Sequence, residues 1–169
     1  DWLGRGDDLF GIPNAVVLMI ILYLLAHLLM SRTVVGRQVY AVGGNPEAAR
    51  LSGVPVKKIL LWVYAGSGAL AGLGGIVMAS QFISGDPKYG LMYELYVIAA
   101  VVVGGTSLSG GRGKVFGTLI GAFIIAVIQN GMNLTGVQSY TQKVVLGLVL
   151  LAAVLLDVLK KRGWKLRAN

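Results

Sequence analysis

The sequence predicts an all-α fold, a polytopic bundle of membrane-spanning helices, and three observations lead to this fold class. Hydrophobic residues make up 56% of the chain and charged residues only 13%, whereas soluble proteins carry about 25% charged residues. Long apolar runs alternate with short polar segments. The 25 glycines suit helices that pack closely inside a membrane. The absence of cysteine excludes disulfide frameworks and thiolate metal sites.

Five apolar segments are candidate spans, because each is close to the length of about 20 residues that a membrane helix needs. They are residues 12–30, 59–79, 93–108, 115–132 and 144–159. The third is marginal in length, so a broken or partly re-entrant helix is the alternative to a full crossing there. We expect residues 1–169 to form a single membrane domain. We also expect it to be part of a longer protein, since Asp1 is preceded by no initiator methionine or signal pattern.

Lysine and arginine predict the orientation of the chain. The cations concentrate between the first two spans, between the third and fourth, and after the fifth: Arg32, Arg37, Arg50, Lys57, Lys58, Arg112, Lys114, Lys160, Lys161, Arg162, Lys165 and Arg167. If all five segments cross, these sets lie on one face, which the positive-inside rule makes cytoplasmic. This grouping favours a crossing by the third segment. It also explains the net charge of +8 without a nucleic-acid partner.

A short polar helix is predicted between the first two spans. Asn45 is a good N-cap, and Pro46 falls at the first helical position, where its missing N–H costs nothing. Glu47 complements the positive end of the helix dipole, and Gly53 can adopt the left-handed conformation that ends a helix. The predicted helix, residues 46–52, has about two turns and is far too short to cross a bilayer. Its position between two spans indicates a docking element.

Two ordered motifs carry a resemblance to a known family. Residues 36–53 read Gly-Arg-Gln-Val-Tyr-Ala-Val-Gly-Gly-Asn-Pro-Glu-Ala-Ala-Arg-Leu-Ser-Gly, and residues 98–113 read Ile-Ala-Ala-Val-Val-Val-Gly-Gly-Thr-Ser-Leu-Ser-Gly-Gly-Arg-Gly. Residues 117–122 and 130–134 extend the match. This pattern resembles the permease subunits of bacterial ABC importers for monosaccharides, the ribose/xylose/arabinose group. The resemblance covers roughly residues 9–159 and corresponds to the C-terminal half of a typical family member.

The resemblance implies a transport role. The chain would be part of the membrane subunit of an ATP-driven importer that moves a pentose or hexose across the bacterial inner membrane. Its implied partners are a second permease subunit, identical or different, a cytoplasmic ATPase that binds ATP and magnesium, a periplasmic sugar-binding protein and membrane lipid. The predicted helix 46–52, within a cytoplasmic loop of residues 32–58, would be the coupling helix that engages the ATPase. The candidate coupling residues are Asn45, Pro46, Glu47, Ala48, Ala49, Arg50, Leu51, Ser52 and Gly53.

We expect Ala48, Ala49 and Leu51 to form a compact apolar docking surface, because small residues suit a close fit of a helix in a groove. Glu47 and Arg50 would make charged contacts at its rim. The alternative is an ordinary solvated loop helix.

No residues for nucleotide or metal chemistry are evident in the sequence. A phosphate-binding loop requires Gly-x-x-x-x-Gly-Lys-Ser/Thr, but counting back from Gly113 and Lys114 places Leu108 at the first glycine position. Val115 occupies the position of the hydroxyl residue. We therefore expect no enzymatic activity, cofactor or metal in this chain, and ATP hydrolysis on a partner.

Within the spans, glycines at four-residue intervals indicate helix packing, with a pore-lining role as the alternative. They are Gly68, Gly72, Gly113, Gly117 and Gly121. Neutral polar residues near span ends are candidates for brief contacts with sugar hydroxyls, unless they cap helix ends or bond across helices. These translocation-path candidates are Thr106, Ser107, Ser109, Gln129, Asn130 and Asn133.

Two other functions remain open from the sequence. One is an ABC permease for a nucleoside or another small solute. The other is a secondary transporter or channel subunit, which usually carries intramembrane ionisable residues. Such residues are scarce within the predicted spans.

Overall fold

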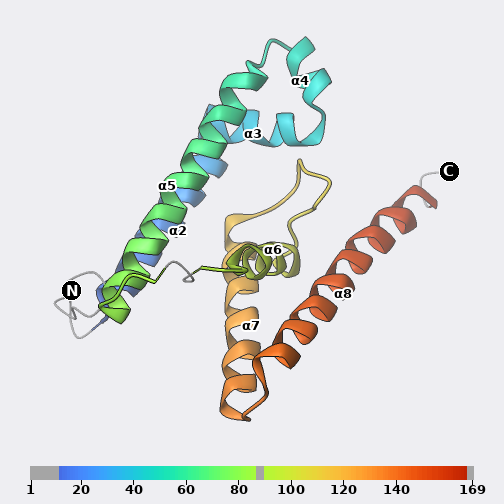
Figure 1. The fold of residues 1–169 in the computed structure, drawn as a ribbon. Helices are drawn as coiled ribbons and strands as arrows, with labels where there is room; N and C mark the ends of the chain where they lie inside the picture. The colour runs from blue at the N-terminus through green and yellow to red at the C-terminus, as the bar shows by residue number, and fades with distance from the viewer. Residues whose placement is uncertain (1–11, 87–89, 167–169) are drawn as a thin grey trace. The chain divides into compact units, whose positions relative to one another are not determined.

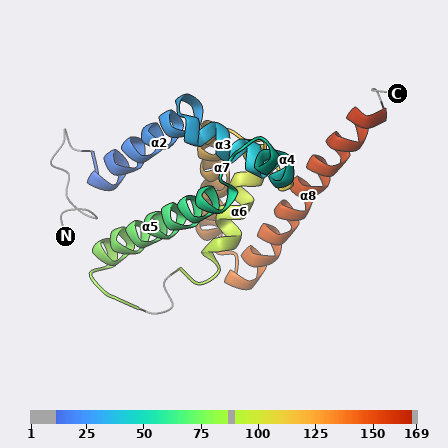
Figure 2. The ribbon, with the colours of Figure 1, turned by 90° about the horizontal axis from the view of Figure 1, so that it is seen from above.

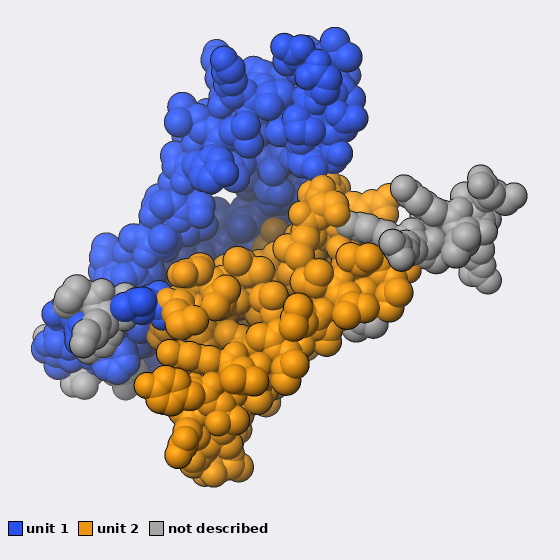
Figure 3. All heavy atoms as spheres, turned by 45° about the vertical axis from the view of Figure 1, so that its right-hand side comes forward, with its two compact units in different colours: residues 1–91 blue, residues 92–169 orange. Residues whose placement is uncertain are grey.

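The structure, a computed structural model, describes residues 12–86 and 90–166, and its regular elements there are α-helices joined by turns (Figure 1). This confirms the all-α prediction. The helices are α2 (Asn14–Arg32), α3 (Val34–Gly44), α4 (Pro46–Leu51), α5 (Val56–Phe82), α6 (Tyr93–Val103), α7 (Val115–Leu134) and α8 (Ser139–Leu166). The chain divides into two compact units, Asp1–Leu91 and Met92–Asn169, shown in blue and orange in Figure 3.

Four described helices are long and apolar enough to cross a membrane: α2, α5, α7 and the part Ser139–Leu159 of α8. Their boundaries differ from the predicted spans, because α5 includes Lys57 and Lys58 and α8 begins at Ser139. A basic or polar first turn can continue a helix beyond the hydrocarbon region, where water satisfies the backbone. Arg167, predicted to belong to the C-terminal basic cluster, lies outside the described residues.

In the first unit, α3 and α4 join the two long helices, α2 and α5. The sequence predicted a loop over residues 32–58 with a helix only at residues 46–52. It missed α3, whose two C-terminal glycines and four valines disfavour a helix. The Thr33 hydroxyl caps α3 by accepting a hydrogen bond from the Gly36 amide at 3.1 Å. Gly36 lies so close to the carbonyls of Leu29 and Met30 that no side chain fits there. A glycine therefore permits the sharp bend between α2 and α3.

The small core of this unit lies where α3, α4 and α5 meet. Val42, Ala49 and Ile59 are buried there, one from each helix. Val39, Val54 and Val56 pack around them. This cluster fixes α4 against the first turns of α5.

Gly68 and Gly72 do not lie at a helix contact within the described unit. A Cβ atom at either position would meet nothing within 4 Å. Figure 2 shows α2 and α5 apart, so α2 does not cover the glycine face of α5. Within the described part of the first unit, the predicted small-residue packing of α5 is therefore not formed.

In the second unit, α6 ends earlier than the sequence predicted. The helix stops at Val103 rather than continuing to residue 108. The amide of Gly105 donates to the Val102 carbonyl at 2.9 Å, and the amide of Thr106 donates to the Val101 carbonyl at 3.1 Å. With Gly105 at φ +84°, this is a Schellman stop. Eleven residues span only about 16 Å, so α6 as a helix covers about half of the hydrocarbon core of a bilayer.

Glycines allow α6 and α7 to approach closely. Gly117 lies against Gly104, and Gly121 lies against the Ala100 carbonyl oxygen. Each helix thus presents a pair of small residues four positions apart, which is the pattern of close membrane-helix contacts. Gly113, predicted to continue this face, precedes α7 and instead contacts the side chain of Thr106 within the connecting loop. Its inclusion in the helix face was wrong because α7 begins only at Val115.

The remaining helix, α8, packs on α6 through its N-terminal half. Ala99 and Ala100 of α6, Ile125 of α7 and Leu146 of α8 form the buried core of the second unit. At the turn between α7 and α8, the Gln142 amide donates to Asn133 Oδ1 and to the Val137 carbonyl, both at 2.9 Å. These contacts position the first turns of α8.

Candidate functional site

The best-defined candidate site is α4, and its N-terminus has the predicted capping. Asn45 Oδ1 accepts hydrogen bonds from the amides of Glu47 and Ala48, at 3.1 and 3.0 Å. Pro46 occupies the first helical position. Two amides that the helix leaves unpaired are thereby satisfied. The predicted start of the helix is confirmed.

The C-terminus of α4 is equally well defined. Gly53 has φ +82°, and its amide donates to the Arg50 carbonyl at 3.0 Å. The Val54 amide donates to the Ala49 carbonyl, also at 3.0 Å. This is a second Schellman stop, with Val54 packed against the core that contains Ala49. Because both ends are closed by specific hydrogen bonds, a six-residue helix is held in one conformation.

The structure corrects the predicted apolar surface of α4. Ala49 is only 5% exposed and packs against Val42 and Ile59. It supports α4 from within the unit and offers no surface to a partner. Leu51, by contrast, is 79% exposed, and Ala48, three residues before it, is also exposed. The exposed apolar part of α4 is therefore centred on Leu51.

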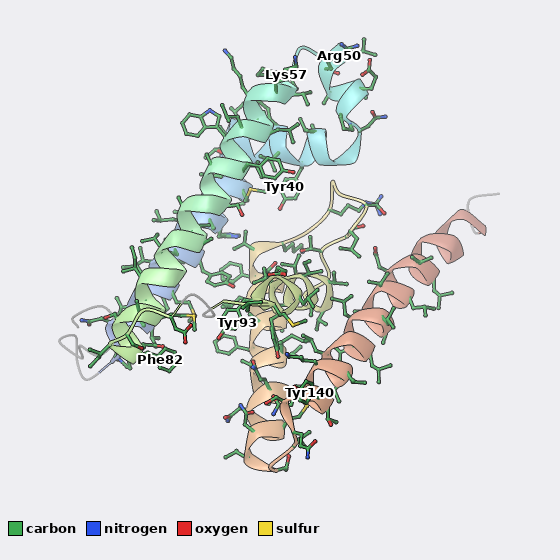
Figure 4. All side chains as sticks on the ribbon, in the orientation of Figure 1. Tyr40, Arg50, Lys57, Phe82, Tyr93 and Tyr140 are labelled. Carbon is green, nitrogen blue, oxygen red and sulfur yellow. The ribbon has the colours of Figure 1, made fainter. Side chains whose placement is uncertain are left out.

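Charged residues of α4 lie near this exposed leucine in the sequence. Arg50 Nη2 and Glu47 Oε1 form an ion pair at 2.7 Å, and both side chains are about two-thirds exposed. An exposed pair of this kind adds little stability, so its side chains are free to exchange partners. Figure 4 shows Arg50 and Lys57 at the same end of the first unit, with Phe82 at the opposite end of α5. The unit thus presents an apolar residue within a mixed-charge rim at one end.

The polar residues predicted to line a path do not form one site. Thr106, Ser107 and Ser109 lie in the loop before α7, whereas Gln129, Asn130 and Asn133 lie in its last two turns. Fourteen residues separate Val115 from Gln129, which corresponds to about 21 Å along the helix. The two groups are therefore at opposite ends of α7. Asn133 also bonds Gln142 across the α7–α8 turn, as the alternative reading of these residues anticipated.

Sequence reasoning missed Asp157 as a partner of Ser107. Ser107 is buried, and its Oγ donates to Asp157 Oδ2 of α8 at 3.3 Å. Asp157 falls inside a candidate membrane segment, Ser139–Leu159, where ionisable residues are costly and usually functional. That placement was the available signal.

The described part of unit two contains a small apolar cavity. Its volume is about 80 Å³, and Leu95, Tyr96, Lys143, Leu146 and Leu150 are among the lining residues. Small-molecule sites usually have volumes of about 300–1,000 Å³. The cavity is therefore too small for a sugar. Among the described residues, no cluster of histidine, aspartate or glutamate could hold a metal ion.

Comparisons with known proteins decide the family. The sequence pattern of the family described as "Branched-chain amino acid transport system / permease component" matches residues 4–154. The chain belongs to this permease family. No solved structure matches it.

Individual relatives within the family include sugar permeases. The chain is 49% identical to the ribose import permease protein of Escherichia coli (strain K12) over 156 residues, covering 92% of this chain and 48% of that protein. It is 48% identical to the ribose import permease protein of Bacillus subtilis (strain 168), covering 91% of this chain and 48% of the relative. The chain is 44% identical to the xylose transport system permease protein of Escherichia coli (strain K12), covering 92% of this chain and 40% of that protein. The chain thus spans about half the length of these relatives or less.

The family assignment and the four apolar helices together make this chain part of a multi-pass membrane protein. In this permease family member, α4 falls within residues 4–154, as do both small-residue contacts of α6 and α7.

Proposed function

We propose that this permease segment belongs to the membrane-spanning subunit of an ATP-driven ABC importer in the bacterial inner membrane, and that its substrate is a monosaccharide. Similarity to the ribose and xylose permeases supports the substrate class. A periplasmic sugar-binding protein would deliver the sugar to the permease. A cytoplasmic ATPase that binds ATP and magnesium would supply the energy for transport. A second permease subunit would complete the pathway.

The observation that carries this proposal is the construction of α4. Two capped ends and a buried Ala49 hold the helix rigidly against α5, while Leu51 remains exposed. A rigid helix of this kind can transmit a displacement of a bound ATPase to the first turns of α5. A solvated loop helix would not need the buried alanine or the second Schellman stop.

The distribution of charge supports a cytoplasmic position for α4. Arg32 ends α2, Arg37 lies in the first turn of α3, and Lys57 and Lys58 lie in the first turn of α5. In unit two, Arg112 and Lys114 precede α7, and the Ser107–Asp157 hydrogen bond brings this loop to the C-terminal part of α8. Within each unit these cations therefore gather at one end, as the positive-inside rule requires for a cytoplasmic face. Lys143, near the start of α8, is an exception at the other end of the second unit.

Reconstitution tests this function. The full-length permease, purified with the ATPase and sugar-binding protein encoded beside it, would be placed in liposomes containing ATP. We expect uptake of radiolabelled pentose or hexose that requires ATP hydrolysis and the binding protein. Uptake of a nucleoside alone would change the substrate class. Uptake that continues without the ATPase would refute the ABC mechanism and favour a secondary transporter or channel.

A further inference from the structure

The loop between α6 and α7, residues 104–114, is folded into a compact closed turn. The Ser107 amide donates to the Arg112 carbonyl at 3.0 Å, and the Gly110 amide donates to the Ser107 carbonyl at 3.1 Å. Ser107 Oγ also accepts from the Ser109 amide at 3.3 Å. Gly110 and Gly111 both have positive φ, at +81° and +70°. Ser107 is therefore the centre of the loop's hydrogen bonding.

Ser107 also links this closed loop to α8, because its hydroxyl donates to Asp157 at 3.3 Å. The two residues are 50 positions apart in the sequence. Ser107 is 8% exposed, and Asp157 is partly buried. A carboxylate within an apolar segment is costly in a membrane unless it has a partner, and the Ser107 hydroxyl is such a partner.

The hydrogen bond to Asp157 holds α8 at a point far from its buried core contact. The buried core contact of α8 is Leu146, eleven residues before Asp157, or about 16 Å along the helix axis. On the C-terminal side of Leu146, three leucines of α8 are each more than half exposed: Leu151, Leu155 and Leu159. Figure 1 shows this part of α8 leaning away from α7. The hydrogen bond therefore restrains α8 well beyond its packed half.

The loop is attached just as firmly at its other end. Its first residue, Gly104, lies against Gly117 of α7. Thr106 packs on Gly113 across the base of the loop. A displacement of α8 at Asp157 would thus reach the close contact of α6 with α7 through a short, hydrogen-bonded segment.

We propose that Asp157 is a positioning residue for transport, which holds loop 104–114 through Ser107 so that α6, α7 and α8 move together. This role rests on the transport function proposed above. Asp157 and Ser107 act on the movement of helices and do not bind the sugar. They should consequently govern the rate of transport and leave the apparent affinity for sugar unchanged.

A cross-linking experiment tests the contact independently of transport. The chain contains no cysteine, so Ser107→Cys with Asp157→Cys can be introduced into the full-length permease after replacing any cysteine outside this segment. A short bifunctional thiol reagent should join this pair in membranes. The control pair, Thr135→Cys with Asp157→Cys, lies at opposite ends of the unit and should not react. Equal reaction of both pairs, or none of the first, would overturn the proposal.

Uptake kinetics in the reconstituted importer test the role. Ser107→Ala and Asp157→Leu should each lower the maximal uptake rate about tenfold, the scale expected for losing a hydrogen bond to a charged group. The half-saturating sugar concentration should not change. Ser107→Thr keeps the donor and Asp157→Asn keeps an acceptor oxygen, so both should retain most of the rate. Thr135→Ala, an exposed hydroxyl removed elsewhere in the same unit, is the matched control.

Normal uptake by Ser107→Ala would overturn the proposal, as would an altered half-saturating concentration with an unchanged maximal rate. If Asp157→Leu does not accumulate in membranes, the smaller Ser107→Ala change and its rescue by threonine decide the outcome. Absence of ATP-dependent uptake by the wild-type complex would refute the proposed function instead. The cross-link would still show whether the loop is held at α8.

Discussion

Gly121 of α7 lies directly against the carbonyl oxygen of Ala100 on α6, so that a Cβ atom at residue 121 would overlap with that oxygen. The backbone of Gly104 adjoins the same position. This contact sets the distance between α6 and α7 and sits beside the buried core of Ala99, Ala100 and Ile125.

We therefore expect Gly121→Ala to destabilise the second unit by about 1–3 kcal/mol, the usual range for overpacking. A thermal unfolding curve of the purified permease in detergent measures this as a lower midpoint. Gly131→Ala is the matched control on the same helix, because a Cβ atom there meets nothing within 4 Å. That control should be neutral or slightly stabilising, since alanine favours helices. Equal midpoints for the two variants would contradict the close contact.

Ala48 and Ala49 provide a second matched pair, adjacent in sequence but opposite in exposure. Ala49→Glu would place a carboxylate against Val42 and Ile59, and we expect it to cost more than about 2 kcal/mol because the charge has no partner there. Ala48→Glu lies on the surface and should change stability by less than about 0.5 kcal/mol. Limited proteolysis of residues 32–58 in the folded permease would distinguish them. Similar protease resistance would show that Ala49 is not a core residue.

The Asn45 cap can be tested by hydrogen exchange. Asn45→Ala removes the acceptor for the amides of Glu47 and Ala48 and should cost about 1 kcal/mol. Amides of α4 should then exchange roughly fivefold faster, which is that free energy expressed as a rate ratio. Asn45→Asp retains a side-chain oxygen and should preserve the protection. Unchanged exchange in the alanine variant would mean that packing alone holds α4.

The orientation of the chain yields a prediction from single cysteines. With no native cysteine in this segment, Ser52→Cys should react with a membrane-impermeant thiol reagent only from the cytoplasmic side. Thr135→Cys, at the far end of α7 from Arg112 and Lys114, should react only from the periplasmic side. Labelling of both from one side would overturn the orientation derived from the basic residues.

Local signals in the sequence were enough to predict much of the fold. The apolar runs located the four long helices, and Asn45, Pro46 and Gly53 defined α4 because capping depends on neighbouring residues. Helix α3 was missed because its valines and glycines have poor helix propensity. The packing of Val42 against Ala49 and Ile59 and the Thr33 cap overcome this propensity. The early end of α6 depended on Gly105 adopting a positive φ. The sequence shows only that a glycine stands there.

The candidate site was less predictable, since it depends on tertiary contacts. The sequence placed Ala49 and Leu51 together on an apolar surface. In the structure Ala49 is buried in the core with Val42 and Ile59, whereas Leu51 lies outside that core and is exposed. Ser107 and Asp157 are 50 residues apart, and no local pattern joins them. The spacing of Gly117 and Gly121 did indicate a close contact, because small residues four positions apart share one helix face.

Co-purification of the ATPase with α4 variants tests most directly whether α4 couples this permease to an ATP-driven partner. Leu51→Glu would be compared with Leu134→Glu, because both leucines are about 80% exposed at a helix end and neither change should unfold the protein. We expect Leu51→Glu to lose the ATPase and sugar-stimulated ATP hydrolysis, while Leu134→Glu retains both. Full retention of the ATPase and of stimulated hydrolysis by Leu51→Glu would contradict the proposed coupling.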